Sequence, residues 1–194
     1  MAKITKAVFL DRDGTINVDY GFTYELMKFR FEEGVIQGLQ KLKLKKYLLI
    51  ITTGQSGMGR GYYTKEEYNK FTDLMLEELK KHDIQLEGVY YCPHHPMEGK
   101  GEFKIDCGCR KPKTGMIQKA VKDMADKGID IDVKNSFVIG DKTDDIKMGE
   151  NAGCRTILLL TESGKKGKDG HYEVKPTFIA KNLDKAADWI IKND

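Results

Sequence analysis

The sequence has few of the features that mark membrane, secreted or nucleic-acid-binding proteins. Among its 194 residues the longest apolar runs, such as Tyr47 to Ile51 and Thr156 to Leu160, are far shorter than the ~20 residues that span a bilayer. The N-terminus has no apolar stretch followed by a signal-peptide cleavage site. We therefore expect no membrane-bound part and a cytoplasmic location.

A strong charge of one sign is also missing. Lys and Arg total 33 and Asp and Glu total 30, which gives a net charge of +3, and no block of five or more like charges is present. Nucleic-acid-binding domains usually carry a concentrated basic face. We therefore expect no nucleic-acid partner, and the weak net charge identifies no other partner. The protein is expected to be a monomer.

Cysteine is scarce, but it is not scattered. The four cysteines are Cys92, Cys107, Cys109 and Cys154. Three of them lie in one short segment with a histidine, and in a reducing cytoplasm such clustering favours metal binding over disulfides. Cys154, beside Arg155 at the start of a predicted strand, is instead expected to be a packed side chain.

The cysteine segment predicts a zinc site. Cys92-x-His94 and Cys107-x-Cys109 are separated by twelve residues, so two close pairs of ligands can close a loop around one ion. Three thiolates and one imidazole fit a tetrahedral structural Zn²⁺ with no open position. His95 is an alternative to His94, since the two are neighbours.

The chain is 40% hydrophobic and 32% charged, and its length suits one domain, expected over residues 1–194 with a zinc loop at about 92–109. Short apolar runs predict buried strands, and helical spacing between them predicts helices; Thr64 and Glu67 form a capping-box pattern at the start of one. Predicted strands cover residues 7–10, 47–51, 88–91, 136–139 and 156–160, and predicted helices begin near residues 35, 64, 114 and 144. This alternation favours an α/β fold, a Rossmann-like parallel sheet with helices on both faces.

Polar residues follow three of these strands. Asp11, Thr53 and Asp141 all fall at carboxyl ends, where ligands bind in parallel sheets. Asp13 adds a second carboxylate on the same tight loop as Asp11, and two such anions repel each other unless a cation lies between them. Mg²⁺ fits, because it takes a few carboxylates and also coordinates phosphate oxygens.

This arrangement predicts phosphoryl chemistry. Asp11 could attack phosphorus to form an aspartyl-phosphate, and Asp13 could protonate the leaving oxygen and later deprotonate the water. Asp141, with Asp145 one helical turn on, would complete the metal site. The plainer alternative is a polar turn after a strand, because Asp and Gly favour turns. Glu32, Glu33, Glu66 and Glu67 are interpreted as solvated charges.

These motifs resemble the haloacid dehalogenase-like phosphatase superfamily. In family order they read Asp11-Arg12-Asp13-Gly14-Thr15, Thr53, Arg110-Lys111-Pro112 and Gly140-Asp141-Lys142-Thr143-Asp144-Asp145. The resemblance implies that Asp11 is the nucleophile and Asp13 the acid/base, and that Thr53 and Lys111 hold the phosphate. It also implies Mg²⁺ ligation by Asp11, the backbone carbonyl of Asp13 and Asp141, with Asp145 acting through water.

A closer resemblance covers nearly the whole chain. Four segments are similar to the D-glycero-D-manno-heptose 1,7-bisphosphate 7-phosphatases, and they run over residues 9–17, 55–61, 90–96 and 107–112. It implies a fold without a full cap domain, zinc binding at the four positions above and a role in nucleotide-activated heptose biosynthesis. One departure is Gly54, where these relatives usually have Asn.

Substrate contacts follow from the same motifs. Arg60 and Arg110 could bind a second phosphate bidentately, while Gln55 and Ser56 could bind hydroxyls. Tyr20, Phe22 and Tyr24 could shield the pocket or simply pack it. The zinc loop would place Arg110 and Lys111 over the phosphate. A small phosphorylated sugar is therefore the expected substrate.

Other functions stay open on sequence alone. A histidinol-phosphate phosphatase, or one for another small metabolite, is the nearest alternative. A zinc-containing binding module without turnover and a DNA-end phosphatase are further alternatives. Residues 163–170, rich in Gly and Lys, are predicted to form a mobile loop.

Overall fold

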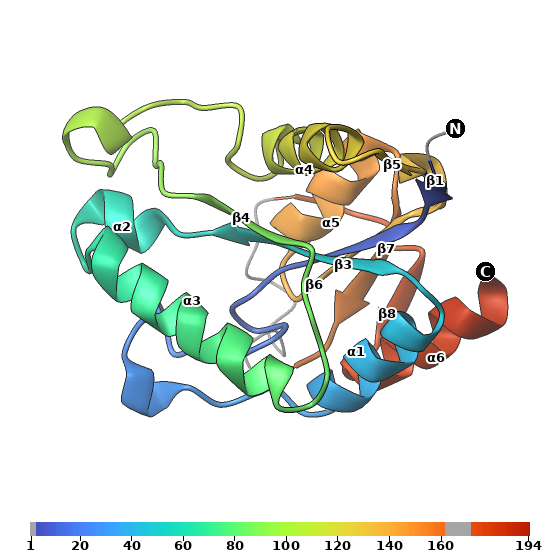
Figure 1. Ribbon diagram of the computed structural model, residues 1–194. Helices are drawn as coiled ribbons and strands as arrows, with labels where there is room; N and C mark the ends of the chain where they lie inside the picture. Colours follow the sequence, from blue (N-terminus) through green and yellow to red (C-terminus); the bar gives the residue numbers. More distant parts are fainter. Residues whose placement is uncertain (1–2, 162–171) are drawn as a thin grey trace.

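The computed structural model describes residues 3–161 and 172–194 and is built around a parallel sheet (Figure 1). Six strands lie in the order β4-β3-β2-β6-β7-β8, and every neighbouring pair is parallel. Their bounds are β2 (Ala7–Leu10), β3 (Leu48–Gly54), β4 (Gly88–Cys92), β6 (Phe137–Gly140), β7 (Arg155–Leu159) and β8 (Phe178–Ala180). A small second sheet pairs β1 (Lys3–Thr5) with β5 (Ile129–Ile131).

Helices cover both faces of the sheet, as predicted. They are α1 (Val35–Leu44), α2 (Ser56–Arg60), α3 (Lys65–Lys80), α4 (Gly115–Ala125), α5 (Thr143–Ala152) and α6 (Leu183–Asn193), with 3-10 turns η1 (Leu26–Lys28), η2 (Gly101–Phe103) and η3 (Val133–Asn135). In Figure 1, α4 and α5 lie above the sheet, and α1, α3 and α6 lie below it. The α/β fold class is confirmed.

The alternation of side chains along β2 shows why two layers of helices are needed. Val8 and Leu10 belong to the core cluster under α1, α3 and α6, whereas Ala7 and Phe9 belong to the cluster under α4 and α5. All four are fully buried. A strand that is apolar on both faces is stable only where both faces are covered.

The predicted elements match the structure closely, although the chain also contains elements that were not predicted. The Thr64 capping box is confirmed, since the Thr64 hydroxyl accepts from the Glu67 N–H at 3.2 Å and the Glu67 carboxylate accepts from the Thr64 N–H at 2.7 Å. The elements without a prediction are β1, β5, β8, α2 and α6. The strands among them are only three residues long and carry little periodic signal.

One prediction about charge was wrong. Glu33, Glu66 and Glu67 are exposed as expected, but Glu32 is buried. Its backbone N–H donates to the carbonyl of Ile16 at 3.0 Å, which places the residue against the loop that follows β2. The predicted mobile loop at 163–170 lies outside the described residues.

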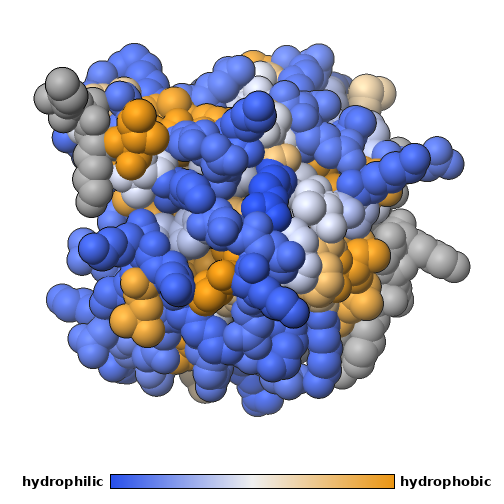
Figure 2. Space-filling view, turned by 90° about the vertical axis from the view of Figure 1, so that its right-hand side faces the viewer, coloured by the Kyte–Doolittle hydropathy of each residue, from blue (hydrophilic) through white to orange (hydrophobic). Residues whose placement is uncertain are grey.

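The apolar side chains on one face of the molecule form separate groups. Figure 2 shows a mostly hydrophilic face with separate hydrophobic groups between the charged side chains. Between β2 and α1 the chain forms only η1, and no cap domain is found in the described ranges. Across residues 3–161 and 172–194, none of the helices has the length and apolar character needed to cross a membrane.

Candidate active site

The loop after β2 brings Asp11 to the edge of the sheet. The Asp11 N–H donates to the carbonyl of Ile139 on the neighbouring strand at 2.9 Å, and the chain then turns sharply at Gly14. Gly14 has a φ of +83°, and a Cβ there would lie 2.3 Å from Oδ2 of Asp141. Only glycine allows this conformation and this close approach without strain.

Three carboxylates meet at this edge. Oxygen atoms of Asp11, Asp141 and Asp145 lie within 4.8 Å of one another, and all three residues are buried. Burial raises the pKa of Asp141 to about 8; Lys142 opposes this rise, while repulsion from Asp11 and Asp145 adds to it. Burial also raises the pKa of Asp145 to about 6, against the attraction of Lys111.

The donor set of this cluster fits a divalent cation. Both carboxylate oxygens of Asp141 are buried and have no hydrogen-bond partner in the described part of the chain. Buried carboxylates are normally paired or bound to metal, because an uncompensated charge is costly in the interior. The all-oxygen chemistry suits Mg²⁺.

Lys111 reaches this cluster from a distant part of the sequence. Its ammonium donates to Oδ1 of Asp11 at 2.8 Å and also to Oδ1 of Asp145. Burial alone would lower the pKa of Lys111, but the two carboxylates raise it. The lysine therefore stays charged beside the Asp11 carboxylate, where an incoming anion would also meet it.

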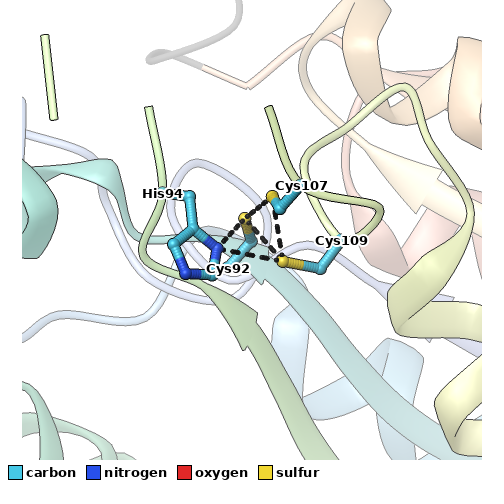
Figure 3. Close-up of side chains that lie close together, drawn as sticks. All are labelled: Cys92, His94, Cys107 and Cys109. Atoms are coloured by element: carbon cyan, nitrogen blue, oxygen red, sulfur yellow. Dashed lines mark hydrogen bonds between the residues drawn. The ribbon is translucent and has the colours of Figure 1, made fainter. Parts of the chain in front are cut away.

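The predicted zinc ligands come together at the end of β4, which holds Cys92, and in the loop that follows it (Figure 3). The three thiol sulfurs of Cys92, Cys107 and Cys109 lie 3.0–3.4 Å apart, and Nδ1 of His94 lies 3.4 Å from Sγ of Cys109. The four ligand atoms lie within 4.8 Å of one another, so the set fits a tetrahedral Zn²⁺.

The structure also separates the two histidines and the fourth cysteine. Nδ1 of His95 accepts from the N–H groups of Met97 and Glu98, so His95 folds back onto its own loop. His94 is therefore the better-placed ligand. Cys154 packs against the core cluster under α4 and α5, as predicted.

Two pockets meet at Asp11. The first has a volume of about 160 Å³ and is lined by Asp11, Gly54, Ser56, Cys92, Arg110, Lys111, Lys142, Asp144 and Asp145. The second, of about 250 Å³, is lined by Asp11, Asp13, Asp19, Gly21, Phe22, Gly54, Gln55, Ser56, Tyr63 and Lys142. Asp11 thus faces a polar cavity with cations on its wall.

Some of the predicted substrate-binding residues line the pockets and others do not. Gly54, Ser56 and Arg110 line the first pocket, and Nη1 of Arg110 donates to the carbonyl of His94 at 3.2 Å. Arg60 lines neither pocket. Its guanidinium pairs with Glu98 and lies over the ring of Phe22 at 5.5 Å, so the structure does not bring it to Asp11.

The aromatic side chains of the segment 20–24, which follows β2, and the amide of Gln55 have specific partners that the sequence did not predict. Phe22 lines the second pocket and meets Tyr62 edge to face, whereas Tyr20 is half exposed and Tyr24 stacks on Tyr63. Thr53 is fully buried, and its hydroxyl accepts from Nε2 of Gln55 at 2.9 Å. The Gln55 amide thus binds protein groups.

Sequence reasoning missed Lys142 and Asp19. Lys142 lines both pockets, and its ammonium lies 3.0 Å from Oδ2 of Asp19. Burial would lower its pKa, but Asp141, Asp11 and Asp19 raise it. The available signal was the position of Lys142 directly after Asp141 at a strand end.

Comparison with known proteins finds relatives that match most of the chain. A family model described as HAD-hydrolase-like matches residues 108–186. The D-glycero-beta-D-manno-heptose-1,7-bisphosphate 7-phosphatase of Haemophilus influenzae is 45% identical over 162 residues, which is 84% of each chain. The Escherichia coli K12 protein of the same name is 38% identical over 193 residues, covering 100% of this chain and 92% of that one.

A solved structure shows the same fold. The D,D-heptose 1,7-bisphosphate phosphatase of B. bronchiseptica, in complex with magnesium and phosphate, superposes with a TM-score of 0.83. It is 24% identical, and the match covers 98% of this chain and 100% of that one.

Proposed function

Because this chain belongs to the haloacid dehalogenase-like phosphatases, within the family of D-glycero-beta-D-manno-heptose-1,7-bisphosphate 7-phosphatases, we propose that it removes the 7-phosphate of that sugar bisphosphate. The observation that carries the proposal is the buried cluster of Asp11, Asp141 and Asp145 with Lys111 at a polar pocket. A carboxylate beside a fixed cation can receive a phosphoryl group. The reaction would serve nucleotide-activated heptose synthesis.

The proposed reaction has two steps. In the first, a carboxylate oxygen of Asp11 attacks phosphorus, the bond to the sugar oxygen breaks, and Asp13 gives that oxygen a proton. In the second, Asp13 takes a proton from a water that attacks the aspartyl-phosphate, which releases phosphate and restores Asp11. Lys111 keeps its positive charge beside the transferring group throughout.

The acidic cluster would hold Mg²⁺. Asp11, Asp141 and the backbone carbonyl of Asp13 are the proposed ligands, with Asp145 acting through water. When bound, Mg²⁺ neutralises charge on the phosphoryl oxygens and aligns them for in-line attack. Both oxygens of Asp145 already accept hydrogen bonds, from Lys111 and from the N–H of Lys142, which supports an indirect role.

The remaining pocket residues bind the substrate in this proposal. Gly54 and Ser56 line both pockets at the end of the strand next to Asp11, and their N–H and hydroxyl groups would hold the 7-phosphate. The buried Thr53 beside them would add its hydroxyl, and Gln55 would add only its backbone N–H, because its amide binds protein groups. Arg110, beside Lys111, would bind the second phosphate bidentately. Arg60 could join it only after leaving Glu98.

Zinc has a structural role in this proposal. Cys92, His94, Cys107 and Cys109 would hold Zn²⁺ and thereby fix the loop that ends in Arg110 and Lys111. We further propose one domain over residues 1–194, a cytoplasmic monomer, and no nucleic-acid partner.

The test is a comparison of substrates in Mg²⁺. Phosphate release is measured for both anomers of heptose 1,7-bisphosphate, for histidinol phosphate and for p-nitrophenyl phosphate, and NMR identifies the product. We expect kcat/KM for the heptose bisphosphate to exceed that for the aryl phosphate by at least ~100-fold, because its second phosphate and hydroxyls add contacts. The product should retain its 1-phosphate.

Two controls make the comparison decisive. Asp11→Asn should abolish release from all substrates, which excludes a contaminating phosphatase. Faster hydrolysis of histidinol phosphate would favour the alternative family function. Equal rates for the heptose bisphosphate and the aryl phosphate would refute the proposed substrate.

A further inference from the structure

Arg12 is a buried cation beside Asp13, which lines the second pocket. Its side chain is 1% exposed, and its guanidinium lies 4.8 Å from the ring centre of Phe71 and 5.5 Å from that of Tyr68. A buried guanidinium needs a partner, because an unpaired charge in the interior is costly. The partner is the neighbouring Asp13.

The pairing of Arg12 with Asp13 is bidentate. Nε of Arg12 donates to Oδ1 of Asp13 at 3.0 Å, and Nη2 donates to Oδ2 at 2.9 Å. Two parallel hydrogen bonds fix the plane of a carboxylate as well as its position. Arg12 therefore restricts the rotation of the proposed acid/base.

Two amides complete the contacts of Asp13. Nδ2 of Asn17 donates to Oδ1 at 3.0 Å, and Nε2 of Gln55 donates to Oδ2 at 2.8 Å. Each carboxylate oxygen thus accepts from a guanidinium and from an amide. Gln55 comes from the segment after β3, so the network joins two separate loops of the site.

Tyr63 sets the orientation of Gln55. Its hydroxyl donates to Oε1 of Gln55 at 2.6 Å, and Nη2 of Arg12 lies 3.3 Å from the same oxygen. The Nε2 group of Gln55 then faces both Asp13 and the hydroxyl of Thr53. Burial raises the pKa of Tyr63, so its hydroxyl remains a donor.

We propose that Arg12, Gln55 and Tyr63 are positioning residues. They hold the carboxyl group of Asp13 at a fixed place relative to Thr53, so that it can transfer a proton to the leaving oxygen. Arg12 and Gln55 act directly on Asp13, and Tyr63 acts through Gln55. The inference rests on the proposed function, because it takes Asp13 as the acid/base. It reassigns Gln55 from substrate binding to orientation of the acid. A proton donor must lie within hydrogen-bond reach of the leaving oxygen, so its placement affects the rate.

The test uses the leaving group to isolate proton transfer. A sugar phosphate needs a proton on its departing oxygen, whereas 2,4-dinitrophenyl phosphate releases a stable phenolate without one. We expect Tyr63→Phe, which removes a single hydroxyl, to lower kcat/KM for the sugar phosphate by ~10-fold and for the dinitrophenyl ester by less than ~2-fold. Arg12→Lys keeps the positive charge but cannot form the bidentate pair with Asp13. It should lower kcat/KM for the sugar phosphate more than Tyr63→Phe does, again with little effect on the dinitrophenyl ester.

A matched control comes from Tyr68, which belongs to the same buried cluster as Tyr63. The hydroxyl of Tyr68 makes none of these hydrogen bonds, although its ring lies against Arg12. Tyr68→Phe should leave both rates unchanged. Circular dichroism and thermal melts show whether each variant is folded.

The outcomes separate this inference from the proposed function. Heptose bisphosphate preference in the unaltered enzyme tests the substrate, and any alkyl phosphate that it hydrolyses can serve in the leaving-group comparison. Asp13→Asn should show the same selective loss as Tyr63→Phe, but more strongly. Equal losses on both esters in Tyr63→Phe, no loss on either, or no selectivity in Asp13→Asn would each overturn the positioning role.

Discussion

The acidic cluster makes a quantitative prediction about stability without Mg²⁺. Burial raises the pKa of Asp141 to about 8 from 3.8; Lys142 opposes this, and Asp11 and Asp145 add to it. Because the folded state binds this proton more tightly than the unfolded chain, stability falls as pH rises between these two values. At ~1.4 kcal/mol per pH unit, this difference in the pKa of Asp141 lowers the free energy of unfolding, relative to its value at low pH, by ~5 kcal/mol at pH 8 and ~2 kcal/mol at pH 5.

Asp141→Asn removes this charge and keeps the shape. Its buried amide costs ~2 kcal/mol wherever it lacks a partner, but this cost does not depend on pH. In Mg²⁺-free buffer, the free energy of unfolding of the variant should therefore exceed that of the unaltered protein by ~3 kcal/mol at pH 8 and equal it at pH 5. The difference between the two pH values, ~3 to 4 kcal/mol, is the diagnostic quantity.

Urea unfolding at pH 5 and pH 8 measures this difference. The buffer is depleted of Mg²⁺ by dialysis without a strong chelator, so that zinc stays bound. Asp126→Asn is the control, because Asp126 is an exposed carboxylate at the end of α4. It should leave the free energy of unfolding unchanged at both pH values. Saturating Mg²⁺ should stabilise the unaltered protein by ~3 kcal/mol at 100 times its dissociation constant and leave Asp141→Asn unchanged. A gap between variant and unaltered protein that is the same at both pH values would refute the reasoning.

Three further predictions concern catalysis, zinc and the loop after β2. Asp11→Asn should lower kcat by at least ~10⁴-fold, because the amide is not a nucleophile; burst kinetics check this, and circular dichroism shows whether the variant is folded. Cys107→Ser should reduce the bound zinc measured by mass spectrometry and the affinity for substrate, whereas Cys154→Ser should retain one zinc per chain; equal zinc in both would contradict the assigned ligands. Gly14→Ala should raise the Mg²⁺ concentration for half-maximal activity by ~10-fold or more, since its Cβ would displace the Asp141 carboxylate, and a normal Mg²⁺ titration would contradict that contact.

Local patterns predicted much of this protein. Buried strands are short apolar runs, and the residues after them necessarily lie at one edge of a parallel sheet, so strand order along the chain was enough to predict that Asp11, Thr53 and Asp141 share that edge. The capping box at Thr64 was equally local. β8 and α6 were not predicted, although Asn182 caps α6 through its side chain, a signal that could have been found.

The sequence alone predicted the candidate nucleophile Asp11, the acidic cluster and the cysteine–histidine cluster, because each depends on a short motif or on strand ends in register. Tertiary structure decided which polar groups pair: it placed Arg60 on Glu98, Lys142 on Asp19, and Gln55 on Asp13. These partners are brought together by packing between separate loops. Since a side chain's hydrogen bonds depend on what surrounds it and on how far it is removed from water, its residue type and spacing do not specify them.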